Sequence, residues 1–264
     1  MVFEARLPKV STLKKIVDAI KDLVKEANIE CNLQGLSLQA MDGSHVALVS
    51  LMLRKEGFED FTNHRNLTLG INLKNLDTFL KCAGKDDSVT LRAEDKADVL
   101  EITFESPSGD KCSTFTLKLM DIDQENLGIP ETPYETTIRL GAGEFQRICR
   151  DLGQLGDTIT ISTARDEVTF SASGDIGGGT MTLRPNSNVE RDEDLVEIEQ
   201  SSPITLSFGV RYLRDFTKAT SLSPLVILKM SPDSPLVVEY VIENLGRISF
   251  YVAPKIESEE GEME

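Results

Sequence analysis

Residues 11–25, STLKKIVDAIKDLVK, decide the fold because their apolar side chains recur at helical spacing. These side chains, at positions 13, 16, 17, 20, 23 and 24, fall on one face of a helix. Three short segments of strand character follow, and the last lies near residues 46–53. The stretch therefore predicts a unit in which a helix is followed by three strands.

The same order of patterns recurs three more times along the chain. Further helices are predicted to start near residues 73, 142 and 210, with spacings of 62, 69 and 68 residues. A strand-like segment precedes each of them, at 67–71, 134–140 and 204–208, and three more follow. Four strand–helix–strand–strand–strand units of about 65 residues indicate internal duplication. The turns between strands are too short for parallel crossovers, so we predict an α+β fold with antiparallel sheets.

Pairing the units two by two predicts two similar domains, residues 1–119 and 134–256. The connecting loop between them is placed at 120–133, which has Gly128, Pro130, Pro133 and four acidic residues but little periodicity. Residues 256–264 contain five glutamates and no basic residue. We therefore expect 257–264 to form a disordered acidic tail.

The composition is that of a globular acidic protein. The 264 residues are 40% hydrophobic and carry a formal net charge of −16, whereas nucleic-acid-binding domains are usually basic. No run of 18 apolar residues predicts a membrane span, and the N-terminus lacks the apolar core of a signal peptide. The four cysteines at 31, 82, 112 and 149 show no metal or redox spacing, so we expect reduced thiols and no metal site.

The charge is distributed unevenly between the predicted helices and the rest of the chain. The windows 11–25, 73–82, 142–153 and 210–219 hold eleven Lys or Arg and six acidic residues, a net charge of +5 that leaves −21 elsewhere. Within each window the basic residues form a stripe away from the apolar face. Ordinary solvated helix faces would also give such stripes. Four equivalent stripes in an acidic chain favour a positive wall that contacts phosphates without reading bases.

Catalytic motifs are weak throughout the sequence. His45 and His64 have no recognisable nucleophile at local spacing. The run GDIGGG at 174–179 lacks the Lys-Ser/Thr of a phosphate loop and leads into a strand, which favours a hairpin turn. The Asp pair at 121 and 123 begins the connecting loop. We therefore expect no enzymatic activity and no cofactor.

Six segments carry a resemblance to a known family over essentially the whole chain. They are FEARL at 3–7, LQAMD at 38–42 with SHV at 44–46, LRAED at 91–95, KLMD at 118–121 with LGIP at 127–130, RICRDL at 147–152, and LVVEY at 236–240 with APKI at 253–256. They resemble the proliferating cell nuclear antigen family, the eukaryotic sliding clamps. The resemblance implies a pseudo-six-fold homotrimeric ring whose helices line a channel around duplex DNA.

The resemblance also implies which residues meet DNA, clients and neighbouring protomers. DNA contacts are expected from Lys14, Lys15, Lys21, Lys81, Lys111, Arg147, Arg150, Arg211 and Lys218. A partner-peptide pocket is expected from Met41, His45, Val46, Leu48, Leu127, Ile129, Pro130, Pro235, Tyr251, Ala253, Pro254 and Lys255. The trimer interface is expected to use Cys112, Phe115, Leu117, Ile176 and Met181.

The chain departs from the family pattern at three positions. Thr78 and Gln154 stand where relatives often have basic or histidine residues, so these two contacts are not expected. Arg165 stands where a regulatory modified lysine often occurs. An arginine cannot take a lysine-linked modifier, so such regulation would need another lysine.

These inferences predict a nuclear DNA sliding clamp that serves as processivity factor and docking platform for replication and repair proteins. The implied partners are double-stranded DNA, two further copies of the chain, DNA polymerase delta and other clients, and an ATP-dependent clamp loader. A checkpoint-clamp subunit in a heterotrimer is the alternative within the family. An acidic histone-binding chaperone and a hydrolase with paired carboxylates are alternatives from other classes.

Overall fold

The chain folds into two compact units of related design. The structure is a computed structural model that describes residues 2–96, 98–123, 133–186 and 190–255. Among these residues, unit 1 takes 2–123, 218–223 and 239–250, and unit 2 takes 133–217, 224–238 and 251–255.

Unit 1 contains two of the four repeats. The first is β1 (Phe3–Leu7), α1 (Val10–Ile20), β2 (Glu26–Asn32), β3 (Gly35–Met41) and β4 (Ala47–Arg54). The second is β6 (Leu67–Asn72), α2 (Leu73–Leu80), β7 (Ser88–Ala93), β8 (Val99–Glu105) and β9 (Cys112–Lys118). The short 3₁₀ turn η1 (Lys55–Gly57) and the strand β5 (Asp60–Asn63) lie between them.

The other two repeats supply most of unit 2. The third is β10 (Thr136–Gly141), α3 (Ala142–Leu152), β11 (Thr158–Ala164), β12 (Glu167–Gly174) and β13 (Gly177–Leu183). The fourth is β15 (Ile204–Gly209), α4 (Val210–Phe216), β16 (Leu225–Met230), β17 (Leu236–Ile242) and β18 (Gly246–Val252). Between them lie η2 (Asp192–Asp194) and β14 (Val196–Gln200), while η3 (Thr217–Leu222) continues α4. The four predicted strand–helix–strand–strand–strand units and the α+β class are therefore confirmed.

The two repeats within each unit exchange their first strands. In unit 1, β1 pairs with β7 of the second repeat, and β6 pairs with β2 of the first. In unit 2, β10 likewise pairs with β16, and β15 with β11. All four pairings are antiparallel. No repeat completes its sheet alone, so each pair of repeats is expected to fold as one body.

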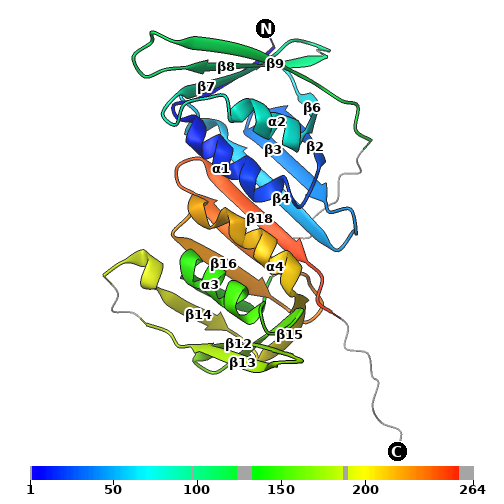
Figure 1. Cartoon of the computed structure of the whole chain (residues 1–264), viewed down its shortest axis with the longest axis vertical. Helices are drawn as coiled ribbons and strands as arrows, with labels where there is room; N and C mark the ends of the chain where they lie inside the picture. The colour runs from blue at the N-terminus through cyan, green and yellow to red at the C-terminus, as the bar shows by residue number, and fades with distance from the viewer. Residues whose placement is uncertain (1, 97, 124–132, 187–189, 256–264) are drawn as a thin grey trace, which may run out of the picture. The chain divides into compact units, whose positions relative to one another are not determined.

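The helices lie in pairs, α1 beside α2 and α3 beside α4 (Figure 1). The apolar face of α1 is buried, with Leu13, Ile16, Val17 and Ile20 at most 8% exposed. In α3, Phe145, Ile148, Cys149 and Leu152 are at most 1% exposed. The faces that carry charge are therefore the ones turned away from the strands.

Two details of the secondary structure differ from the sequence-based expectation. The first helix ends at Ile20, not at 25, because the chain turns at residues 21–23 before β2 begins. Val24 is nevertheless buried, so the apolar periodicity runs on past the helix. The strands β5 and β14 were not predicted: each follows a repeat and adds to the outer edge of that repeat's own first strand.

Most sheet edges in the described part of the chain are short or covered. The backbone N–H of Met120 donates to Gly70 O on β6 at 2.9 Å, and that of Lys255 donates to Ser207 O on β15 at 2.7 Å. These contacts are equivalent, because each joins the segment after a repeat's last strand to the fourth residue of an edge strand. The edge strands β5 and β14 have only four and five residues. The seven-residue strands β9 and β13 stand at sheet edges that no described strand covers.

Candidate nucleic-acid interface and partner surfaces

The basic residues expected to meet DNA lie on the helices and in the turns directly after them. The observed helices hold seven basic and five acidic residues: Lys14, Lys15, Lys74, Arg147, Arg150, Arg211 and Arg214 against Asp18, Asp77, Glu144, Asp151 and Asp215. The other four cations of the predicted windows, at 21, 25, 81 and 218, follow the helix ends. Positive side chains at the C-terminal end of a helix also interact favourably with the negative end of the helix dipole. The excess therefore belongs to helices and adjoining turns together, not to the helices alone.

In unit 1, one carboxylate forms ion pairs with two of the predicted DNA-binding lysines. Lys81 Nζ, at the C-cap of α2, lies 2.7 Å from Asp77 Oδ2, and Lys21 Nζ, at the C-cap of α1, lies 3.0 Å from the same oxygen. Lys21 also pairs with Asp18. Burial by itself would raise the pKa of the Asp77 carboxyl, but the hydrogen bonds and charges of Lys81 and Lys21 lower it below the ordinary value.

Two other lysines of α1 bind backbone carbonyls. Lys14 Nζ donates to Ala83 O at 2.8 Å, in the turn after α2, and Lys15 Nζ donates to Ser221 O at 3.0 Å in η3. Lys218 Nζ lies 2.9 Å from Asp22 Oδ2, and this hydrogen bond lowers the pKa of the Asp22 carboxyl. The predicted cations of unit 1 thus tie α1 to α2 and to η3.

In unit 2 the predicted contacts are arginines that pair along their own helices. Arg147 binds both oxygens of Glu144, at 2.9 and 2.6 Å, and Arg150 Nε lies 2.9 Å from Asp151 Oδ1. The guanidinium of Arg211 lies 5.9 Å from the centre of its neighbour's ring, Tyr212. Lys111 is exposed in the turn before β9, on no helix.

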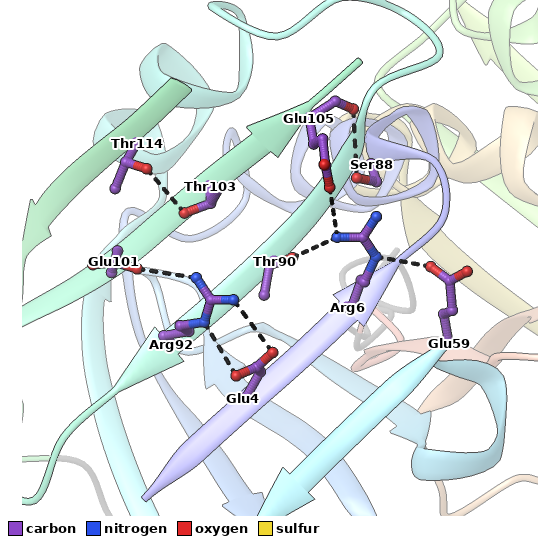
Figure 2. A network of polar contacts seen from close by, with 10 residues as sticks. All are labelled: Glu4, Arg6, Glu59, Ser88, Thr90, Arg92, Glu101, Thr103, Glu105 and Thr114. Carbon is purple, nitrogen blue, oxygen red and sulfur yellow. Dashed lines mark hydrogen bonds and ion pairs between the residues drawn. The ribbon is translucent and has the colours of Figure 1, made fainter. Parts of the chain in front are cut away.

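The opposite face of the five-stranded sheet in unit 1 is predominantly acidic. Figure 2 shows Arg92 between Glu4 and Glu101, and Arg6 between Glu59 and Glu105. Phe3, Ala5 and Leu7 alternate with these residues along β1 and are buried. This face therefore carries four glutamates and two arginines, whereas lysines outnumber aspartates on and just after α1 and α2.

The first part of the predicted peptide pocket is a loop built around Asp42. Its Oδ1 accepts the backbone N–H groups of Val46 and Ala47, each at 2.8 Å, and its Oδ2 accepts that of Ser44 at 3.0 Å. His45 has a φ of 56°, in the left-handed region. The carboxylate thereby fixes the turn that presents His45 and Val46, the latter 38% exposed, to solvent.

Burial by itself would raise the pKa of the Asp42 carboxyl, which is 5% exposed. The three backbone N–H donors lower that pKa below its ordinary value. Sequence inspection did not single out Asp42 as a positioning residue, although an Asp followed by a short polar turn is a recognisable signal.

The remaining pocket residues are distributed between the two units. In unit 1, Leu48 is only 7% exposed, so most of its side chain belongs to the core instead of a pocket wall, while Met41 is half-buried. In unit 2, Pro235, Ala253 and Lys255 are exposed, and Tyr251 and Pro254 are half-buried. Lys255 Nζ donates to Thr158 Oγ1. Leu127, Ile129 and Pro130 lie outside the described residues, as does the predicted acidic tail.

The predicted interface residues lie on or next to the two exposed edge strands. Cys112 is exposed and Phe115 half-buried on β9; Met181 is half-buried on β13, and Ile176, 80% exposed, occupies the turn before it. Leu117 is 2% exposed, so its side chain serves the core of unit 1 and only its backbone is available at the edge.

The described residues contain no group of three or more His, Cys, Asp or Glu side chains placed to hold a metal ion. Burial raises the pKa of the Cys31 thiol to about 12, and also raises that of Cys149. None of the described helices has the length and apolar character to cross a membrane.

Two family models match consecutive parts of the chain. The model described as proliferating cell nuclear antigen, N-terminal domain, matches residues 2–126. The model described as proliferating cell nuclear antigen, C-terminal domain, matches residues 128–255. Together they cover nearly the whole sequence.

The Asp42 loop gives a prediction for stability. Replacement Asp42→Asn puts an amide where two carboxylate oxygens accept three backbone donors, and it should lower the free energy of unfolding by about 1–2 kcal/mol at pH 7. Because the folded-state pKa is lowered, this contribution is present at neutral pH and is lost as the pH falls through that pKa. Urea unfolding of both proteins in steps of decreasing pH should show the difference shrinking.

The matched control is Asp86→Asn, which removes the same charge at an exposed position of unit 1. It should change the unfolding free energy by less than about 0.5 kcal/mol. Equal stability of wild type and Asp42→Asn at pH 7 would contradict the positioning role of Asp42.

Proposed function

The chain belongs to the proliferating cell nuclear antigen family and is a DNA sliding clamp, and on this premise we propose that three copies form a ring around duplex DNA. The ring holds DNA by topology while its contacts with phosphates stay weak. It raises the local concentration of the clients bound to it, among them a replicative polymerase, and thereby makes synthesis processive. We propose that the clamp acts in the nucleus and that it catalyses no reaction itself.

The separation of charge by sheet face is the observation that carries the proposal. An acidic protein would be repelled by DNA if its charge were uniform. In unit 1 lysines outnumber aspartates on the helix side, whereas Figure 2 shows four glutamates and two arginines on the opposite side of the sheet. In unit 2, Arg147, Arg150, Arg211 and Arg214 are likewise exposed on α3 and α4. A channel lined by these helices would therefore attract DNA although the net charge of the protein is −16.

The repeats also indicate how copies would join. By position in its repeat, β18 is the counterpart of β9, and β4 is the counterpart of β13. In unit 1, β18 lies next to β4. The uncovered edges β9 and β13 thus correspond, by position in their repeats, to β18 and β4, which already lie side by side within the chain. Pairing β9 of one copy with β13 of the next covers both edges head to tail and closes a ring where the rotation permits.

A clamp also needs a surface for its clients. We propose that the turn held by Asp42, with His45 and Val46 exposed on it, forms one side of a peptide-binding surface. Exposed apolar side chains beside fixed backbone are suited to a short peptide with aliphatic and aromatic anchors.

The edge-strand assembly predicts the effect of a single charge. Ile176→Lys places an ammonium beside β13 and should weaken self-association about tenfold or more, as measured by sedimentation over a dilution series. Leu33→Lys is the matched control, because Leu33 is also an exposed aliphatic residue, 69% accessible, in a hairpin turn. A stable trimer of unchanged affinity in Ile176→Lys would contradict this interface, and assembly only with different chains would favour the checkpoint-clamp alternative.

Primer extension on a circular template tests the function. With a replicative polymerase, a clamp loader and ATP, the wild-type chain should lengthen the products of a single binding event. Arg147→Glu with Lys218→Glu should shorten them about tenfold while leaving the trimer intact, because two phosphate contacts become repulsive. Arg65→Glu with Arg191→Glu, which reverses two exposed arginines that belong to none of the α-helices, is the charge-matched control. No stimulation by the wild-type chain, or equal loss in both variants, would contradict the proposal.

A further inference from the structure

Lys81 and Lys21, two of the predicted DNA contacts of unit 1, do not present unopposed charge. Asp77 Oδ2 lies 2.7 Å from Lys81 Nζ and 3.0 Å from Lys21 Nζ, and Lys21 also pairs with Asp18. Two ammonium groups and two carboxylates therefore form one cluster whose charges cancel. A phosphate that approaches either lysine must compete with a carboxylate already in place.

The members of this cluster differ in exposure in a way that assigns them different roles. The side chain of Lys81 is 67% exposed, so its ammonium can reach a phosphate. The side chains of Asp77 and Lys21 are only 13% and 18% exposed. Asp77 is therefore shielded from a bound phosphate, and it acts through the lysines that it holds.

The position next to Asp77 adds to the effect. Thr78, the residue after Asp77, contributes no positive charge, and its hydroxyl donates to Lys74 O at 3.0 Å within the helix. Similar pairs occur elsewhere in the described chain, in Lys218 with Asp22 and Arg147 with Glu144. Asp151 also pairs with two predicted contacts, Arg147 at 3.7 Å and Arg150 at 2.9 Å, but its side chain is 31% exposed, against 13% for that of Asp77.

We propose that Asp77 is a positioning residue that weakens the contact of Lys81 and Lys21 with DNA and so keeps the loaded clamp mobile. This inference rests on the proposed function. It differs from a purely structural role, in which Asp77 would only tie α1 to α2. A structural tie would change stability, whereas a tuning residue changes DNA affinity, its salt dependence and the rate of sliding.

A double-mutant cycle separates the two roles. In the full-length clamp, Asp77→Asn should tighten binding to a short linear duplex about fivefold, the effect of one unit charge at about 4 Å in water. Its logarithmic salt slope should steepen by about 0.9 for each lysine released to a phosphate. Lys81→Gln should cost less than about twofold in the wild-type background and about fivefold in the Asp77→Asn background. On end-blocked DNA, the diffusion coefficient of Asp77→Asn should fall by a similar factor.

The matched control is Glu59→Gln, which removes one carboxylate charge from an ion pair with Arg6 on the opposite sheet face. It should leave affinity, salt slope and diffusion unchanged, because it raises the net charge equally but far from the lysines. Thermal unfolding of every variant reports the structural contribution separately. If Asp77→Asn does not fold, Lys81→Gln in the otherwise wild-type clamp still tests the inference. A fivefold or larger loss of DNA affinity in this variant would show that Asp77 does not weaken the contact of Lys81 with DNA.

The outcomes for this inference and for the proposed function are distinct. A wild-type chain that is loaded and slides, with Asp77→Asn indistinguishable from it in affinity and diffusion, overturns the role of Asp77 alone. A wild-type chain that is not retained on circular DNA overturns the proposed function, whatever the variants do. Equal gains in Asp77→Asn and Glu59→Gln would show a general effect of net charge and would also overturn the inference.

Discussion

The exchange of first strands between neighbouring repeats is the constraint on which the rest of the structure depends. Because β1 completes the sheet of the second repeat and β6 that of the first, the two repeats cannot separate without opening both sheets. The same exchange in unit 2 places α3 and α4 as a pair. Helix pairing, separation of charge by face and the positions of uncovered edges all follow from this arrangement.

Charge is organised at two levels in this fold. In unit 1 the helix side is the more basic and the opposite sheet face the more acidic, so a chain of net charge −16 would offer a basic surface to DNA in the proposed ring. Within the basic surface, most predicted contacts are already bound to a carboxylate or a carbonyl of the same chain. Under the proposed function, attraction to DNA would be present but moderated, which suits a protein that stays on DNA while moving along it.

Periodicity was sufficient to predict the repeats, since strands and helices of this length leave clear apolar patterns in sequence. It failed where burial came from neighbouring elements: Val24 continues the helical pattern although α1 has ended. The strand β14 does alternate, with Val196 and Ile198, but β5 has only four residues and gives too short a signal. The pairs Asp18–Lys21 and Asp77–Lys81 are visible as helical spacings. Lys21–Asp77 and Asp22–Lys218 join distant segments, so only the folded chain reveals them.

The family models show the clamp fold, and the proposed ring would hold duplex DNA by topology. The most direct measurement loads the full-length chain onto a nicked circular duplex with a clamp loader and ATP, removes free protein, and then linearises half of the sample. A closed ring should stay on the circular DNA and be lost from the linear molecule through its ends. Equal retention on both forms, or equal loss from both, would contradict it.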